Sequence, residues 1–162
     1  MGRFLANILV AECKLSRNII QPLLNFGMRF YVAYVFFKSG LTKVDDKFQV
    51  TQSTKDLFAY EFNVPLLPSD VAAYLASYAE LILPILLVLG FLSRPAALAL
   101  FILNAVAAYS LAQTDFASAA GHWQHIAWGA MLAMVFAYGP SKISIDRWLS
   151  QKWRDLESNL LL

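Results

Sequence analysis

The sequence predicts an all-α membrane protein: an antiparallel bundle of four transmembrane helices, with amphipathic interfacial helices at both ends. Of its 162 residues, 59% are hydrophobic and only 15% are charged, whereas an ordinary soluble protein has roughly 25% charged residues. The apolar residues gather in four long runs, at 23–41, 71–91, 96–112 and 123–138. Continuous runs of about 18 or more apolar residues are typical of membrane spans.

The distribution of basic residues predicts the orientation of these spans. If each run crosses once and the N-terminus is cytosolic, only Lys43, Lys47 and Lys55 lie outside among the loop residues. The cytosolic side then holds a larger set: Arg3, Lys14, Arg17, Arg94, Lys142, Arg147, Lys152 and Arg154. Acidic residues such as Asp115 dilute the outer charges further. Cytosolic loops of membrane proteins are enriched in Lys and Arg, so both termini are expected in the cytosol.

Residues 1–22 are expected to form the first interfacial helix. Ile8, Leu9, Leu15 and Ile19 recur at helical spacing between charged residues, which is the pattern of a helix lying in a membrane surface. The four spans then occupy 23–140, and Pro22 stands before the first of them, where a first-turn proline is tolerated.

The connections between the later spans predict how the helices are arranged. The second and third runs are separated only by a turn around Ser93, Arg94 and Pro95, and the link between the third and fourth is also short. Short links make consecutive helices antiparallel neighbours, which gives an up-down-up-down bundle.

The segment 44–70 is the exception, because it is long and rich in apolar residues for a loop in water. We interpret it as a lid over the outer end of the bundle, with a short helix near 54–61. Long ordered loops of this kind are usually functional. Ser69 or Asp70 is placed to cap the second span.

The C-terminal segment 144–159 predicts a second interfacial helix. Ile145, Trp148 and Trp153 alternate with charged residues at helical spacing, and tryptophan side chains favour the headgroup level of a membrane. We interpret this helix as a surface anchor in preference to a partner-recognition helix. The whole chain, 1–162, is then a single transmembrane domain.

Ionisable residues inside the apolar runs are the candidate site, because charged side chains in a bilayer are costly and most often functional. Glu80 lies well inside the second run, and a carboxylate there must pair with a cation or take up a proton. Lys38, Lys43 and His125 are its candidate partners. The predicted catalytic residues are Glu80 and His125, and the predicted substrate-binding residues are Lys43, Lys38, Arg29, Asn104 and His122.

Each of these residues also has a purely structural interpretation. Glu80 could be a strut between helices, Arg29 could extend toward the interface or brace a neighbouring helix, and His122 could be an interfacial residue. A metal bound by His122 and His125 would need a third ligand such as Glu80, so no metal site is expected. The lone cysteine, Cys13, excludes an internal disulfide, a CxxC motif and a cysteine-based metal cage.

Three stretches together resemble the DoxX family. "RFYVAYVFFKSGLTKVDD" is similar to the family's first span, with an arginine and then a glycine and lysine near the outer end. "LFAYEFNVPLLPSDVAAYLASYAELILPILLVLGFLSRPAAL" resembles its second span, with a membrane glutamate and a following arginine turn. "YGPSKISID" is similar to the closing GPGxxSxD signature, except that Ser141 replaces a glycine.

The resemblance implies a four-helix protein of the bacterial inner membrane. Some family members are the membrane subunit of a thiosulfate:quinone oxidoreductase. Others accompany sulfurtransferase-like and superoxide-dismutase partners, or genes for copper-handling peptide modification. The expected function is therefore a quinone-linked oxidoreductase subunit acting on a small sulfur oxyanion or thiol-derived substrate.

Quinone is the cofactor that the resemblance implies for this function. The sequence contains no flavin, haem or iron–sulfur motif, so electrons would have to pass directly from the substrate to quinone or through a partner. The expected partners are membrane lipid, a soluble redox or sulfurtransferase-like protein, and a second copy of the chain, with no nucleic acid. The alternative is a non-catalytic membrane protein that anchors a soluble partner or handles a small molecule or copper. A transporter is less well supported, because the sequence has no inverted repeat or second glycine-broken helix.

Overall fold

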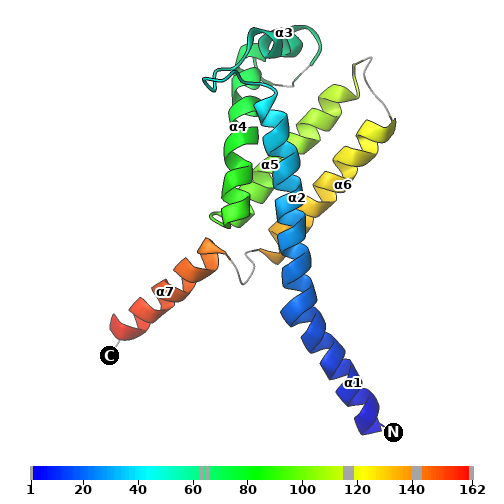
Figure 1. Cartoon of the computed structure of the whole chain (residues 1–162), viewed down its shortest axis with the longest axis vertical. Coiled ribbons are helices and arrows are strands. Elements are labelled where there is room, and N and C mark those ends of the chain that lie inside the picture. Colours follow the sequence, from blue (N-terminus) through cyan, green and yellow to red (C-terminus); the bar gives the residue numbers. More distant parts are fainter. Residues whose placement is uncertain (1, 63, 65, 115–118, 140–143, 161–162) are drawn as a thin grey trace.

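The computed structural model describes residues 2–62, 64, 66–114, 119–139 and 144–160. Throughout this part the chain is helical apart from its loops and one isolated antiparallel bridge, so the all-α prediction is confirmed. Asp115, Ser141 and Lys142 lie outside the described residues, as does the side chain of Arg3. The elements are α1 (Gly2–Leu15), the π-helix η1 (Ser16–Ile20), α2 (Gln21–Leu41), α3 (Gln52–Tyr60), α4 (Ser69–Leu89), α5 (Ser93–Leu111), α6 (Ala119–Tyr138) and α7 (Ile145–Leu160) (Figure 1).

The N-terminal helix is present but is not separated from the first predicted span. Helix α1 continues through η1 into α2 and projects away from the packed helices (Figure 1). Pro22 lies in the first turn of α2. It has no N–H to donate to the preceding turn, and the wider π turn of η1 lies directly before it. The placement of α1 on a membrane surface remains a prediction.

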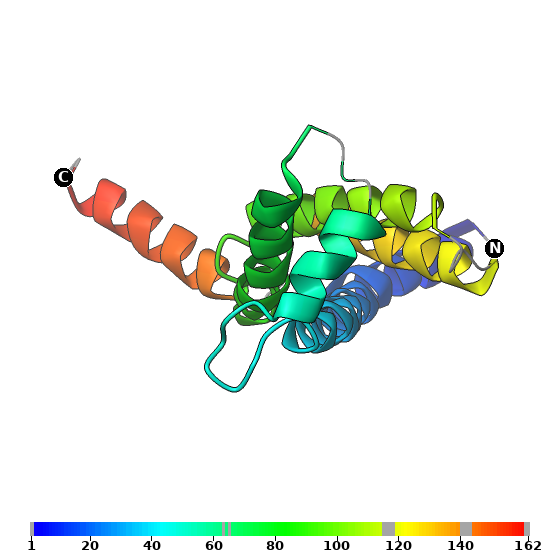
Figure 2. The ribbon, with the colours of Figure 1, turned by 90° about the horizontal axis from the view of Figure 1, so that it is seen from above.

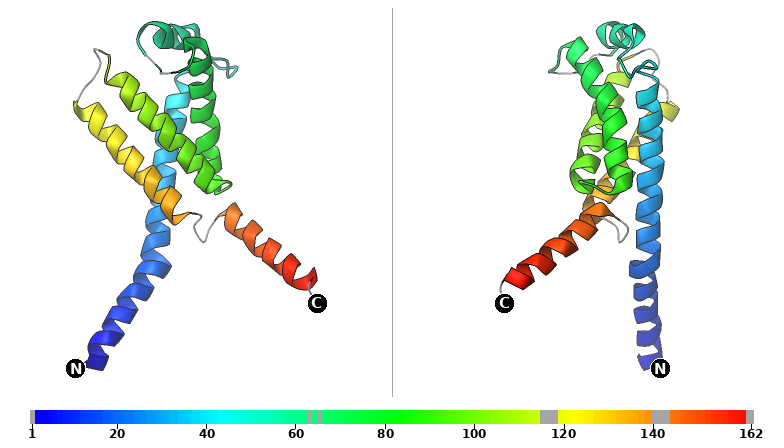
Figure 3. Two further views of the ribbon diagram at one scale, coloured as in Figure 1. Left: turned by 180° about the vertical axis from the view of Figure 1, so that it is seen from behind. Right: turned by 60° about the vertical axis from the view of Figure 1, so that its left-hand side comes forward.

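Four helices pack in a ring. Helix α2 packs against α4 and α6, and α5 packs against the same two neighbours. Helices α2 and α4 run side by side, while α5 and α6 lean away from them toward the end that α3 covers (Figures 1 and 3). Both chain termini lie at the other end of the molecule (Figure 3).

The buried core fills the end of the ring nearer the termini. Its largest fully buried apolar side chains are Val32, Leu87, Leu100, Leu132 and Val135, which come from all four helices. Between helices in a membrane, close van der Waals packing of such side chains stabilises the association. This core therefore holds the two helix pairs together at one end and leaves them apart at the other.

The predicted lid is confirmed as a packed structure with its own helix. The Thr51 side chain caps α3 by accepting from the backbone N–H of Thr54. Phe58 of α3 is buried against Ala72 and Ala73 of α4. Figure 2 looks down on this end, where α3 lies across the ends of α2 and α4.

Among the described residues, two helices are long and apolar enough to cross a membrane. They are α4 and α5, with mean hydropathies of 2.0 and 1.4. Helix α2 is made less apolar by Arg29 and Lys38, and α6 by His122 and His125. The coarser expectation, a helical protein with apolar helices of membrane-spanning length, is confirmed, and the four-span bundle remains a prediction.

Candidate functional site

A cavity of about 1400 Å³ lies between the two helix pairs, beneath α3. Its walls are mostly apolar and come from α2, α3, α4, α5 and α6. Exposed residues of α4 and α5, including Leu75, Ile82 and Ile102, also line it. The cavity therefore reaches the protein surface between α4 and α5.

Glu80 enters this cavity at a close contact between α2 and α4. A Cβ atom at Gly40 of α2 would lie 3.1 Å from the backbone carbonyl carbon of Glu80 and 3.0 Å from Leu81 Cδ2. These distances are tighter than most Cβ contacts, and Gly40 is itself buried. The absence of a side chain at Gly40 thus allows the two helices to approach beside the carboxylate.

Glu80 forms an ion pair with Lys43. Lys43 Nζ lies 2.5 Å from Glu80 Oε2, and the two side chains are 15% and 8% exposed. The same ammonium group donates to Ser39 Oγ at 2.9 Å. Lys43 directly follows the C-terminal end of α2, where a positive charge is favoured by the helix dipole.

The lid is attached to the same lysine through the main chain. The carbonyl oxygen of Lys43 accepts from the Thr51 N–H and from Thr54 Oγ1, each at 3.1 Å. Since Thr51 caps α3, these two hydrogen bonds fix the start of the lid helix relative to Lys43 and therefore to the ion pair. Any shift of α3 would therefore disturb Lys43 and its contact with Glu80.

His125 reaches the cavity from α6, the helix diagonally across the ring from α4. His125 Nδ1 lies 2.9 Å from Asn104 Oδ1, and Asn104 Nδ2 donates to the backbone carbonyl of His125 at 2.9 Å. Trp128 packs its ring edge-on to the imidazole, with the ring centroids 5.1 Å apart, and also contacts Phe36 of α2. The cavity thus presents a carboxylate, an ammonium and an imidazole on an otherwise apolar surface.

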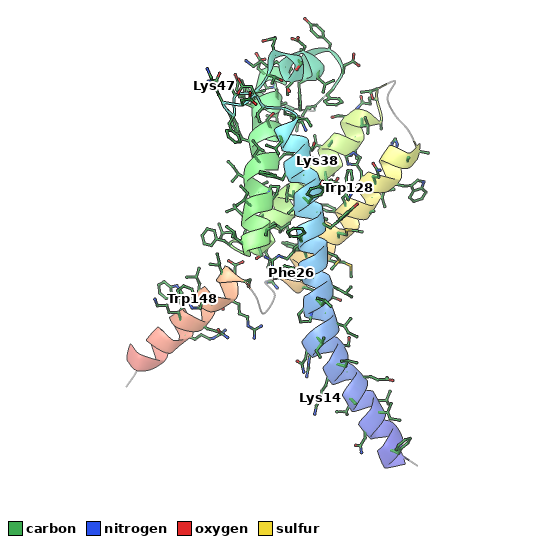
Figure 4. All side chains as sticks on the ribbon, in the orientation of Figure 1. Lys14, Phe26, Lys38, Lys47, Trp128 and Trp148 are labelled. Atoms are coloured by element: carbon green, nitrogen blue, oxygen red, sulfur yellow. The ribbon has the colours of Figure 1, made fainter. Side chains whose placement is uncertain are left out.

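Three predicted site residues lie elsewhere. Lys38 is exposed on α2 and does not line the cavity (Figure 4). His122 is exposed at the start of α6. Arg29 is 1% exposed at the opposite end of the ring. Its Nε donates to the Leu87 carbonyl at 2.9 Å, and an η nitrogen donates to Val88 at 3.0 Å.

Arg29 belongs instead to a structural cluster around the α4–α5 turn. Its guanidinium donates to the carbonyls of Leu87 and Val88 in the last turn of α4, where carbonyl groups lack the full set of helical partners. The Leu87 carbonyl also accepts from the Gly90 N–H. Gly90 follows with φ of +69°, and a Cβ there would come within 2.7 Å of the Arg29 guanidinium. The sequence interpretation of Arg29 as a brace for a neighbouring helix agrees with these contacts.

Asp146 completes this cluster, and the sequence reasoning did not assign it a role. Its carboxylate accepts from the N–H groups of Leu92 and Ser93 and from Ser93 Oγ, at 2.7–2.8 Å. Burial alone would raise the pKa of Asp146, but the bonds from Ser93 and Leu92 and the charge of Arg29 hold it below its ordinary value. Asp146 is the last residue of the stretch "YGPSKISID", but that stretch does not reveal its contact partner. Helix α5 begins after Leu92, which makes no side-chain cap, and Asp146 supplies the cap from α7.

In the described part of the chain, no group of three or more His, Cys, Asp or Glu residues is placed to hold a metal ion. Cys13 is exposed on α1, remote from the cavity.

The fold and the cavity define a helical membrane-type protein with a mostly apolar binding space. A family model described as DoxX matches residues 24–113. An uncharacterised protein of Haemophilus influenzae is 34% identical over 121 residues, which covers 74% of this chain and 78% of that relative. No solved structure matches the chain. The chain belongs to the DoxX family, whose matched range includes Lys43, Glu80 and Asn104 and ends before His125.

Proposed function

We propose that the protein is a quinone-linked oxidoreductase subunit whose cavity binds a quinone within the membrane. The observation that supports this most directly is the cavity itself. It is large, it is lined mostly by apolar side chains, and it opens between the apolar helices α4 and α5. Binding sites of small molecules are typically apolar with a few polar groups that fix orientation.

The polar groups on the cavity wall match the needs of a quinone head group. When bound, a quinone accepts two electrons and two protons, so its site must supply or exchange protons. Lys43 Nζ can donate a hydrogen bond to a carbonyl oxygen. A carboxylate such as Glu80 and an imidazole such as His125 are side chains of the kinds that transfer protons in enzymes. The opening between α4 and α5 would leave an isoprenoid tail in the lipid.

The electron donor in this proposal is a small sulfur oxyanion or a thiol-derived compound, as in other DoxX-family systems. Two thiosulfate ions joined as tetrathionate release two electrons, which one quinone takes up together with two protons. Lys47 lies in the loop between α2 and α3 (Figure 4), and its positive charge would attract such anions. A soluble sulfurtransferase-like or redox protein is the partner that would deliver a bound donor.

In this proposal, α2, α4, α5 and α6 each cross the bacterial inner membrane once. The basic residues of α1, of the α4–α5 turn and of α7 then face the cytosol, in agreement with the positive-inside rule. Trp148 lies on α7, apart from the four packed helices (Figure 4), and is exposed. It would anchor α7 at the headgroup level, as interfacial tryptophans do.

The test is to purify the protein in mild detergent and extract it with organic solvent. We expect quinone to be recovered with the parent and with Glu61→Gln, whose glutamate is exposed beyond α3. Glu80→Gln and His125→Asn should lose bound quinone or thiosulfate-dependent reduction of a short-chain benzoquinone. Folded parent protein that carries no quinone and binds none when it is added would overturn the proposal.

A non-catalytic membrane partner is the second candidate, and the observation that favours it is the surface of α7. Trp148 and Trp153 are 59% and 67% exposed on this projecting helix. A soluble partner could dock there. Wild-type levels of quinone binding and quinone reduction in a chain truncated after Arg147, which keeps Asp146 and removes both tryptophans, would separate the quinone site from this role.

A further inference from the structure

The contact between Asn104 and His125 fixes more than the position of the imidazole ring. The Asn104 amide nitrogen donates to the backbone carbonyl of His125, which can only accept. The amide oxygen must therefore be the atom that faces His125 Nδ1, at 2.9 Å. An amide oxygen has no proton, so Nδ1 carries the hydrogen of this bond. Asn104 thus selects one of the two neutral tautomers.

The surroundings leave this pair little freedom to rearrange. Asn104 is 4% exposed. A Cβ atom at Gly129 would lie 3.2 Å from Asn104 Nδ2, so the glycine makes room for the amide. Trp128 packs edge-on to the imidazole, and Phe36 packs edge-on to Trp128. The amide and the tryptophan therefore hold the ring from two sides.

We propose that Asn104 is a positioning residue that holds His125 in the Nδ1–H tautomer, so that Nε2 is the atom that exchanges a proton in the cavity. This inference rests on the proposed function for its role in the reaction. A proton taken up at Nε2 leaves the Nδ1–H···Oδ1 bond intact, because Nδ1 is a donor in both the neutral and the cationic ring. Uptake and release then need no rotation of the ring.

The other ionisable groups around the cavity determine the electrostatic surroundings of His125 during proton exchange. Lys43 at the end of α2 and Glu80 on α4 are paired with each other, so their charges offset. Asp70, Tyr74 and Tyr78 line the wall from α4. His122 lies one turn before His125 on α6.

The tautomer can be measured directly, without quinone. The chain has two histidines, so protein labelled with ¹⁵N-histidine gives few imidazole signals, and His125→Asn assigns those of His125. Above the titration midpoint of His125, we expect a protonated Nδ1 and an unprotonated Nε2, whose ¹⁵N resonance lies far downfield. A protonated Nε2 in the parent protein would overturn the inference.

Two substitutions and a control identify Asn104 as the cause. Asn104→Leu removes the acceptor, and the downfield Nε2 signal should give way to that of the Nε2–H tautomer. Asn104→Asp keeps an acceptor for Nδ1–H and should retain the parent pattern even if the leucine variant does not fold. Gln124→Leu, at an exposed position on the same turn of α6, should leave it unchanged. An unchanged tautomer in folded Asn104→Leu would contradict the role of Asn104.

The functional part is tested separately. Quinone reduction should fall about 100-fold in Asn104→Leu, which is the lower end of the range typical of general acid–base catalysis, and less in Asn104→Asp. If the protein shows the expected tautomer but binds no quinone, Asn104 still positions His125, and the proposed function is wrong. Full activity in an Asn104→Leu protein with the altered tautomer would reject proton exchange at Nε2.

Discussion

Gly40 of α2 lies directly against the backbone of Glu80 on α4, so the buried carboxylate lies beside a close contact between these helices. The same contact fixes the reach of Lys43, which follows three residues later and forms the ion pair. The ion-pair geometry therefore depends on a residue that has no side chain of its own.

Gly40→Ala should destabilise the protein. Its Cβ would lie 3.0–3.1 Å from Leu81 and Glu80, so α2 and α4 would have to move apart, and overpacking of this kind typically costs about 1–3 kcal/mol. Thermal unfolding in detergent, followed by circular dichroism, measures the loss.

Gly27→Ala is the matched control for this change, because nothing lies within 4 Å of a Cβ at Gly27 on the same helix. There the substitution should stabilise the helix by about 0.5–1 kcal/mol, since alanine loses less backbone entropy than glycine. Equal melting temperatures for the two variants would show that the close approach at Gly40 does not affect the stability of the protein.

The Lys43–Glu80 pair should show coupling in a double-mutant cycle. Lys43→Met or Glu80→Gln alone leaves the other group without its partner in a mostly buried place, and the loss of one partner can cost about 3 kcal/mol. The double variant should cost less than the sum of the two, by about 0.5–3 kcal/mol. Unfolding of the four proteins under one condition gives this coupling free energy.

Lys14→Met and Glu61→Gln serve as controls for the cycle, because both residues are exposed. Their effects should be small and additive. A coupling free energy of zero for Lys43 and Glu80 would mean that the ion pair makes no net contribution to stability.

Much of the fold could be predicted from the sequence, because the strongest signals are long apolar runs. The four runs correspond to α2, α4, α5 and α6, and the apolar loop contains α3 where a short helix was expected. The continuity of α1 with α2 was not foreseen, because Pro22 is a usual mark of a helix start. The π turn that accommodates it leaves no separate sequence signal.

The candidate site could be predicted in part. Glu80, Asn104 and His125 were recognisable as polar residues inside apolar runs, and Lys43 as a basic residue just beyond the first run. The structure brings these four residues to one region. Arg29 is also a charged residue inside an apolar run, yet it lies at the other end of the ring. Helical periodicity predicts which face of a helix a residue occupies, but not which neighbouring helix that face contacts. The role of Asp146 depends on a contact with Ser93 across more than fifty residues, which no local pattern encodes.

Asp146 should make stability depend on acidic pH. Its folded-state pKa lies below its ordinary value of 3.8, so the folded protein binds fewer protons than the unfolded chain in this range. The stability that the ionised Asp146 contributes is therefore fully present when the pH is above its pKa in the unfolded chain. That stability is lost as the pH falls through its pKa in the folded protein. Melting temperatures measured between neutral pH and acid should fall more steeply for the parent than for Asp146→Asn.

Asp46→Asn is the control for this titration, because Asp46 is an exposed loop carboxylate. It should retain the slope of the parent. The same slope in Asp146→Asn as in the parent would show that the cap on α5 does not depend on the charge of Asp146.

The proposed orientation in the membrane can be tested with reporter fusions. A reporter that is active only outside the cytosol should work when fused after Asp56 in α3 and fail when fused after Arg94 in the α4–α5 turn. The reason is the excess of basic residues at the end that carries both termini. The reverse pattern would place α3 and the mouth of the cavity on the cytosolic side.

Asn25→Leu should leave stability unchanged or raise it. Asn25 is 5% exposed on α2, one turn before Arg29, and neither its amide nitrogen nor its oxygen has a hydrogen-bond partner in the part of the chain that the structure describes. A buried polar group without a partner costs about 1–3 kcal/mol, whereas an apolar side chain of similar shape avoids that cost. Thermal unfolding of Asn25→Leu beside Asn25→Ala separates the two contributions, because alanine removes the polar group but also leaves a cavity. A melting temperature for the leucine variant well below that of the parent would show that the Asn25 amide has a partner after all, and that this partner stabilises the end of the ring that Arg29 and Asp146 hold together.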